Sequence, residues 1–121
     1  MKLILIVDDS PTEVHVMQTA LQRHGYRTAV ASDGAEGIRL AREMRPDLIF
    51  MDIVMPGMNG YQATRTLTND PDTSGIPIVM VTSKGQETDR IWGLRQGAVD
   101  YMVKPFSPDD LVAKAQSTLA A

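Results

Sequence analysis

Five short apolar runs, separated by segments with the residue spacing of amphipathic helices, constrain what this chain can fold into. Charged or turn-forming residues bound each run, a pattern typical of strands buried on both faces of a sheet. The predicted strands cover residues 3–7, 27–31, 48–52, 78–81 and 98–103, and the second, which is the least apolar, is expected near a sheet edge. Because a helix is predicted after each strand, the order βαβαβαβαβα favours right-handed crossovers onto a parallel sheet. The sequence therefore predicts one three-layer α/β domain.

Capping sequences and apolar stripes define the predicted helices. The first has Ser10 as N-cap, Pro11 at its first position and Glu13 placed to close a capping box. A second helix follows Asp33, a third covers residues 61–67, a fourth residues 86–96, and a fifth follows Ser107. The residues expected to face the core recur at helical spacing: Val14, Met17, Ala20 and Leu21, then Ile38, Ala41 and Met44, then Ile91 and Leu94, and finally Leu111, Val112, Ala115 and Leu119.

Length and composition narrow the class of protein. At 121 residues the chain is long enough for one domain with a real core. A net charge of −3 argues against a nucleic-acid surface, which needs clustered Lys and Arg, and the absence of Cys excludes disulfides and thiolate metal ligands. The apolar run after Lys2 is too short for a signal peptide or a membrane span. We expect a single domain over residues 1–121 without an output domain, monomeric, cytoplasmic and not inserted in a membrane.

Polar side chains stand at four of the five predicted strand ends. Asp8 and Asp9 follow the first strand, Asp52 ends the third, Thr82 follows the fourth and Lys104 follows the fifth. Taken singly, Asp52 and Thr82 have the alternative of capping a turn, and Lys104 that of a surface ion pair with Asp8 or Asp9. In an open parallel sheet, however, the carboxyl ends of the strands line one crevice. The agreement of the strand ends predicts that these groups meet there.

The chemistry of this predicted crevice favours phosphoryl transfer. Carboxylates held close together repel one another unless a cation intervenes, and an all-oxygen donor set suits Mg²⁺, or Mn²⁺ in its place. Asp52 would then have an oxygen free to attack phosphorus as a nucleophile. Thr82 would donate a hydrogen bond and Lys104 a positive charge to the transferring phosphoryl group.

Four motifs make the chain resemble a receiver domain of two-component response regulators over essentially its whole length. They lie at residues 5–9, 51–60, 81–83 and 100–105. The resemblance implies a flavodoxin-like fold with sheet order 2-1-3-4-5. It also implies that Asp52 accepts a phosphoryl group from a phosphohistidine of a sensor histidine kinase. Such a domain is no enzyme in the turnover sense, since it catalyses only its own phosphorylation and dephosphorylation.

The resemblance assigns further roles to individual residues. Asp9, Asp52 and the backbone carbonyl of Val54 would bind Mg²⁺ directly, and Asp8 would act through a water molecule. Thr82 and Lys104 would hold the phosphoryl group. Tyr101 would be the switch residue that turns inward on activation, and a cis peptide before Pro105 would aim Lys104 into the crevice.

Two positions in such domains set the rate of dephosphorylation, and here they are Val54 and Lys84. An apolar Val54 cannot orient an attacking water molecule. The sequence therefore predicts slow autodephosphorylation.

Residues 60–65 and 89–97 are similar to single-domain regulators of chemotaxis-like systems that control type IV pili and twitching motility. The similarity implies output to a separate protein through the face formed by the fourth helix, fifth strand and fifth helix. Trp92 lies one helical step from Ile91, so it is expected partly exposed near that face, with burial in the core as the alternative.

Other functions fit the residues less well. A flavin-phosphate site needs a Ser, Thr or Gly-rich loop after the first strand, where Asp8 and Asp9 would instead repel the phosphate. A haloacid-dehalogenase type hydrolase needs a second carboxylate two residues after its nucleophile, where Val54 stands, and a cap domain. The alternatives that stay open are an interaction module that works without phosphorylation and a phosphate sink.

Overall fold

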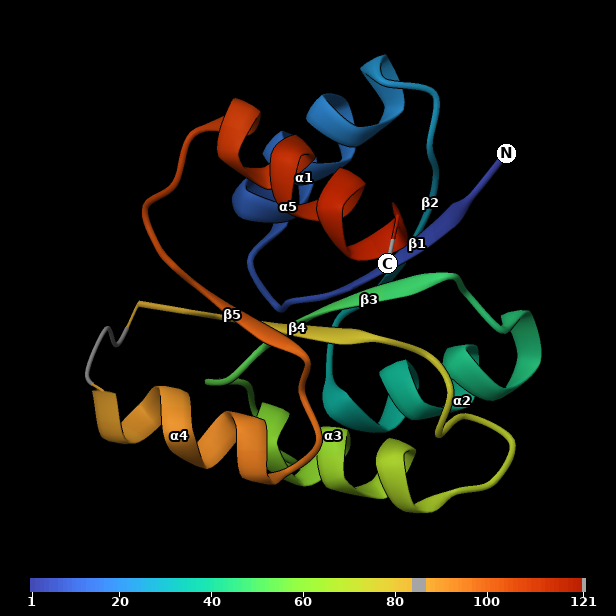
Figure 1. Ribbon diagram of the computed structural model, residues 1–121, viewed down its shortest axis with the longest axis vertical. Helices are drawn as coiled ribbons and strands as arrows, with labels where there is room; N and C mark the ends of the chain where they lie inside the picture. Colours follow the sequence, from blue (N-terminus) through green and yellow to red (C-terminus); the bar gives the residue numbers. More distant parts are fainter. Residues whose placement is uncertain (84–86, 121) are drawn as a thin grey trace.

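The computed structural model describes residues 1–83 and 87–120 as alternating strands and helices (Figure 1). The strands are β1 (Leu3–Val7), β2 (Arg27–Ala31), β3 (Leu48–Asp52), β4 (Ile78–Thr82) and β5 (Asp100–Val103). The helices are α1 (Pro11–Arg23), α2 (Gly34–Met44), α3 (Gly60–Asn69), α4 (Glu87–Arg95) and α5 (Pro108–Ala120). The predicted element order is confirmed. Residues 84 and 86, which carry the predicted Lys84 role and the predicted start of the fourth helix, lie outside the described residues.

The strands form one parallel sheet in the order β2-β1-β3-β4-β5. This is the predicted flavodoxin-like order, with β2 at an edge as expected. The three central strands, β1, β3 and β4, are buried along their full lengths. Their apolar runs are therefore explained by helices on both faces.

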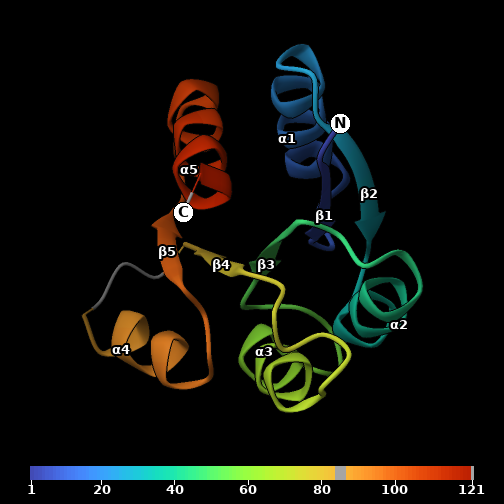
Figure 2. The same ribbon diagram turned by 45° about the vertical axis from the view of Figure 1, so that its right-hand side comes forward.

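Two helices cover one face of the sheet and three cover the other. α1 and α5 lie together on one side, and α2, α3 and α4 lie on the other (Figures 1 and 2). Neighbouring residues of β1 point to opposite faces, as a pleated strand requires. Ile4 and Ile6 therefore pack under α1 and α5 with Leu111, whereas Leu5 and Val7 belong to the cluster on the α2 and α3 side.

The capping box predicted at the first helix is wrong, although its N-cap is right. The Glu13 N–H donates to Ser10 Oγ at 3.4 Å, but the Glu13 side chain pairs with Lys104 instead of returning to the cap. A complete capping box begins α3, where the side chains of Asn59 and Gln62 each accept the other residue's backbone N–H. This cap explains why α3 begins earlier than predicted.

Two residues predicted to face the core, Met44 and Ile91, are exposed. Met44 is the last residue of α2, almost one turn beyond the buried Ala41. In α4 the buried residue is Gly93, where an added Cβ would lie 3.2 Å from Met80 Cγ. Because α4 approaches the sheet at Gly93, Ile91 is rotated by about 200° away from it, and Leu94 is half-buried.

The strand predicted from residue 98 begins at Asp100. Ala98 is buried and the Val99 N–H donates to the Ile78 carbonyl at 2.8 Å, so the chain joins the sheet before the regular strand starts. The other residues predicted to form the apolar stripes of α1 and α5 are buried or packed against the core. Among the described residues, no helix is long and apolar enough to cross a membrane.

Candidate phosphoryl-transfer site

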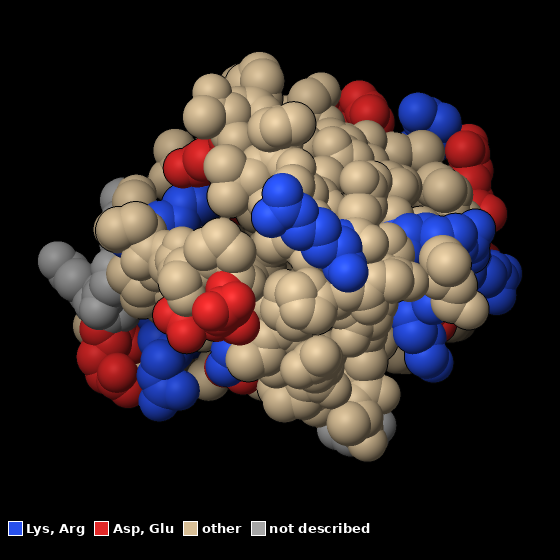
Figure 3. Space-filling model, turned by 90° about the horizontal axis from the view of Figure 1, so that it is seen from above, with Lys and Arg blue, Asp and Glu red and all other residues tan. Residues whose placement is uncertain are grey.

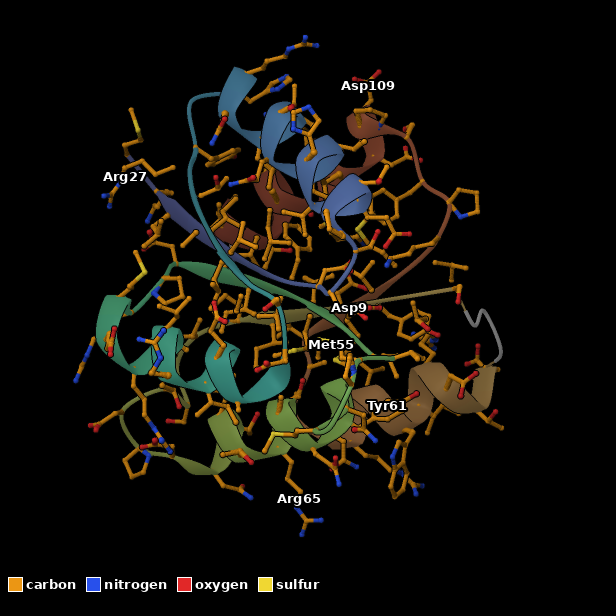
Figure 4. All side chains as sticks on the ribbon, turned by 180° about the vertical axis from the view of Figure 1, so that it is seen from behind. Asp9, Arg27, Met55, Tyr61, Arg65 and Asp109 are labelled. Carbon is orange, nitrogen blue, oxygen red and sulfur yellow. The ribbon has the colours of Figure 1, made fainter. Side chains whose placement is uncertain are left out.

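Three carboxylates meet at the C-terminal edge of the sheet. Asp8 and Asp9 follow β1, Asp52 ends the neighbouring strand β3, and one oxygen from each lies within 4.8 Å of the others. Figure 4 shows Asp9 at this edge with Met55, which belongs to the loop after β3. The predicted convergence of these three carboxylates is present in the structure.

Asp8 is buried and held on both oxygens. Its Oδ1 accepts the Ser10 N–H at 2.9 Å, and its Oδ2 accepts Lys104 Nζ at 3.0 Å. The Asp8 N–H in turn donates to the Ala31 carbonyl at 3.0 Å, which ties the residue to the end of β2. Asp9, by contrast, is exposed at the mouth of the site. The cluster therefore has one fixed inner carboxylate and one that faces solvent.

Asp52 is only 7% exposed, and its environment disfavours the charged form. Burial, followed by the charge of Asp8, raises the pKa of Asp52 to about 6, although Lys104 at 3.5 Å opposes the shift. The backbone beyond it is fixed, since the Ile53 N–H donates to the Val81 carbonyl and the Ile53 carbonyl accepts the Gly60 N–H. Asp52 is thus a rigidly placed carboxylate that is still ionised at neutral pH.

Lys104 is the cation of the site. Its ammonium group donates hydrogen bonds to Asp8 and Glu13 and lies 3.5 Å from an Asp52 oxygen. These carboxylates outweigh the burial of the side chain and raise the pKa of Lys104 above its ordinary value. The peptide bond between Lys104 and Pro105 is cis.

Sequence reasoning missed Glu13 as a site residue. Its local pattern suggested a capping box, and the contact with Lys104 joins the first turn of α1 to the end of β5. The only indication in the sequence was that Glu13 lies in the first turn of α1, the helix that begins just after Asp8 and Asp9. That signal does not identify a partner 91 residues away in the chain.

Thr82 and Tyr101 lie on the neighbouring strands β4 and β5. Thr82 is buried, and the Lys104 N–H donates to its carbonyl at 2.7 Å. Tyr101 is half-buried and packs against the core on the α3 side. Burial and the charge of Asp89 raise the pKa of Tyr101, while a side-chain hydrogen bond with Thr82 opposes them. Thr82 and Tyr101, the predicted switch residue, are therefore in contact.

The loop between β3 and α3 carries Val54, whose side chain is exposed. Gly60 closes the loop against the end of β3, and a Cβ added at Gly60 would stand 2.1 Å from the Asp52 carbonyl oxygen. Only a residue without a side chain fits there.

The donor set fits a hard divalent cation. Mg²⁺ takes one or two carboxylates together with water, and here the oxygens of Asp9 and Asp52 join those of Asp8 without any nitrogen or sulfur ligand in the cluster. Both oxygens of Asp8 already accept hydrogen bonds from the protein. This arrangement suits a role for Asp8 through water rather than as a direct ligand.

Comparison with known families gives one match across most of the chain. The response regulator receiver domain family matches residues 4–116. Protein PilH of Pseudomonas aeruginosa strain PAO1 is 52% identical over 120 residues, which cover 99% of each chain. The DNA-binding response regulator MtrA of Mycolicibacterium smegmatis is 44% identical over 116 residues, and the chain spans half of that longer protein.

Solved structures agree with this family match. The chemotaxis protein CheY4 of Vibrio cholerae superimposes with a TM-score of 0.93 at 31% identity, covering 98% of each chain. The receiver domain of sensor histidine kinase PA1611 from Pseudomonas aeruginosa PAO1, solved with a magnesium ion coordinated in its active-site cleft, gives 0.92 at 32% identity, covering 99% of this chain and 98% of the other. The chain therefore belongs to the response regulator receiver family, whose members are phosphorylation-dependent signalling modules of two-component systems.

Proposed function

We propose that Asp52 accepts a phosphoryl group from a phosphohistidine of a sensor histidine kinase and that this change controls a separate partner protein. The observation that carries the proposal is the buried Asp52 carboxylate, which clusters with the Asp8 and Asp9 carboxylates and lies 3.5 Å from the Lys104 ammonium. A structural carboxylate would pair with one cation and be complete. Here three clustered carboxylates stand beside a single lysine, so their excess negative charge favours binding of a metal ion, which in turn can bind a phosphoryl group.

The chain's own residues account for the transfer step. An Asp52 oxygen attacks phosphorus, so that a new P–O bond forms as the P–N bond to the donor imidazole breaks and the imidazole keeps the bonding electrons. Lys104 supplies positive charge to the phosphoryl oxygens, and the Thr82 hydroxyl supplies a hydrogen bond. Asp9, Asp52 and the Val54 carbonyl would hold Mg²⁺ directly and Asp8 would act through water. A bound Mg²⁺, or Mn²⁺ in its place, supplies charge neutralisation at the phosphoryl oxygens.

The signal is proposed to leave through the face made by α4, β5 and α5. Four large apolar side chains are exposed on or next to this face: Ile91, Trp92, Val99 and Val103. A contiguous exposed apolar patch marks a protein contact, and we propose that these side chains contribute to one. Tyr101 on β5 connects the face to Thr82, so we propose that it moves when Thr82 closes on the phosphoryl group.

The biological setting is proposed from similarity. The identity with protein PilH extends over the full length of both chains, which supports a regulator that acts on its partner in trans within a chemotaxis-like system for type IV pili. Viewed from above, the surface over α1 and α5 has interspersed acidic and basic groups among mostly uncharged ones (Figure 3), unlike a nucleic-acid-binding face. We propose a monomer in the cytoplasm, where a histidine kinase draws on ATP.

Intact-mass measurement tests the proposed phosphorylation. Incubation with Mg²⁺ and acetyl phosphate is expected to add one phosphoryl group to the parent and none to Asp52→Asn. Chelation of the metal is expected to abolish labelling. A parent that stays unlabelled while a known receiver domain is labelled would favour a module that works without phosphorylation.

A further inference from the structure

The Lys104 ammonium is surrounded by carboxylates before any phosphoryl group arrives, with hydrogen bonds to Asp8 and Glu13 and an ion pair with Asp52 at 3.5 Å. An ammonium has three N–H donors, and Lys104 faces three carboxylates, those of Asp8, Glu13 and Asp52. Only 14% of the Lys104 side chain is exposed, so water replaces these contacts poorly. A phosphoryl oxygen that binds Lys104 therefore competes with these carboxylates for the ammonium group.

The three partners differ in how readily they can be displaced. Asp8 is buried and fixed on both oxygens, and Asp52 is itself the predicted phosphoryl acceptor. The Glu13 side chain is 44% exposed and lies outside the group of carboxylates that could share a metal ion. Among the described residues, Lys104 is also the only cation with which Glu13 pairs. Glu13 is the partner that can move into water at the lowest cost.

The surroundings of Glu13 give its side chain room to move. Glu13 and Lys104 line a surface cleft of 350 Å³ together with Thr12, Val16, Met17 and Phe106. The backbone N–H of Glu13 stays bonded to Ser10 Oγ whatever its side chain does. The carboxylate can therefore leave Lys104 without unwinding the start of α1.

We propose that Glu13 is a positioning residue that holds the Lys104 ammonium in the unphosphorylated state and competes with the incoming phosphoryl group for it. This inference rests on the proposed phosphorylation of Asp52. Its consequence is that Glu13 slows phosphorylation, because Lys104 must exchange a carboxylate for the phosphoryl oxygens. The negative charge of Glu13 beside an anionic donor acts in the same direction.

Glu13→Gln and Glu36→Gln form a matched pair for the test. Each residue is the third after its N-cap and each is the acidic residue of a first helical turn, in α1 and α2. Each substitution removes one negative charge near a helix N-terminus, but Glu36 accepts a hydrogen bond from Ser32 and has no ion pair with Lys104. Glu13→Asp completes the set, because it keeps the charge on a side chain that is one methylene shorter.

The measurements are the rate of phosphorylation by acetyl phosphate at saturating Mg²⁺ and the affinity for beryllofluoride by titration calorimetry. Glu13→Gln is expected to be phosphorylated about fivefold faster and to bind beryllofluoride about fivefold more tightly, the size of one weak ion pair. Glu36→Gln is expected to match the parent. The gain should persist at high salt, where a general charge effect is screened, and Glu13→Asp should show part of it.

The outcomes separate this inference from the proposed function. Suppose that the parent is phosphorylated but that the phosphorylation rate of Glu13→Gln is the same as that of the parent or of Glu36→Gln, or is lower. Glu13 then does not compete for Lys104 and the inference is overturned. If the parent itself is not phosphorylated, the proposed function fails first. A gain confined to low salt would also overturn the inference, since it would show a general charge effect.

Discussion

Asp52 is held at a cost to the folded state, because the site in which we propose that it acts as a nucleophile also desolvates it. Its folded pKa of about 6 lies above the ordinary value of 3.8. The folded protein therefore binds a proton at Asp52 more tightly than the unfolded chain does, and the ionised form opposes folding above that pKa. The cost is present at neutral pH and fades as the pH falls from about 6 towards 3.8.

Asp52→Asn is accordingly expected to raise the free energy of unfolding by about 2 kcal/mol at pH 7 in the absence of divalent ions. The gain should shrink as the pH is lowered and be nearly gone at pH about 4. Urea unfolding of parent and variant at several pH values in EDTA measures the difference. An equal gain at both ends of this pH range would show that burial and Asp8 do not perturb Asp52.

Val54 has an exposed side chain and stands two residues after Asp52, the proposed phosphoryl acceptor. An aliphatic group has no atom with which to orient a water molecule for attack on the phosphoryl group. Val54→Asn supplies an amide and is expected to shorten the phosphoryl lifetime about tenfold or more. Loss of label after removal of the donor gives the lifetime, with Val54→Ala as the control for side-chain size. An unchanged lifetime in Val54→Asn would refute the role of this position.

Helix α3 begins at a glycine, Gly60, that packs directly against the end of β3. Ala is the better helix former by about 1 kcal/mol, so Gly60→Ala would stabilise a free helix. A Cβ at Gly60 would, however, lie 2.1 Å from the Asp52 carbonyl oxygen and 2.8 Å from Ile53 Cα. Backbone atoms cannot yield as a side-chain tip does, so Gly60→Ala is expected to lower the free energy of unfolding by about 2 kcal/mol or more.

Gly75→Ala is the control, because a Cβ there meets no described atom within 4 Å and its backbone is not left-handed. It is expected to change stability by less than about 0.5 kcal/mol. Chemical unfolding of both variants measures the two changes in the free energy of unfolding. A Gly60→Ala variant as stable as Gly75→Ala would mean that α3 can shift away from the active-site strand.

The spacing of apolar residues predicts the buried face of α1 but not that of α4. The buried residues of α1 follow an apolar stripe at regular spacing, and all four predicted positions are buried. In α4 the helix rests on the sheet through Gly93, which carries no apolar side chain to signal burial. The apolar Ile91 therefore suggests the wrong face, and Leu94 is only half-buried. Close backbone approach depends on the partner surface, here Met80, and local periodicity does not contain that information.

The stability of the protein should depend on Mg²⁺, since the folded chain brings the three carboxylates together and the unfolded chain does not. Mg²⁺ at about 100 times its dissociation constant is expected to add about 2.7 kcal/mol. Asp9→Asn should lose most of this gain while keeping the fold, because Asp9 is exposed. Thermal unfolding with and without Mg²⁺ measures both. A gain of equal size in Asp9→Asn would place the ion elsewhere.

The same global arrangement explains which site residues a sequence reveals. Strand ends of a parallel sheet converge by topology, so Asp8, Asp9, Asp52 and Lys104 could be placed together before any coordinates. Glu13 could not, because its pairing with Lys104 depends on the distance between the first turn of α1 and the end of β5. Topology assigns neighbours to strand ends. Side-chain reach across two elements requires the three-dimensional structure.

The contact between α3 and α4 also gives the protein a built-in optical reporter. Trp92 is the only tryptophan in the chain, its ring meets that of Tyr61 edge-on at 6.5 Å, and 51% of it is exposed. The Tyr61 hydroxyl donates to the Asp89 carbonyl, so the pair ties α3 to α4 (Figure 4 shows Tyr61 on α3). Indole emission is sensitive to both solvent and neighbouring rings. Rapid-mixing fluorescence on the unlabelled protein can therefore follow movement of α4 in real time.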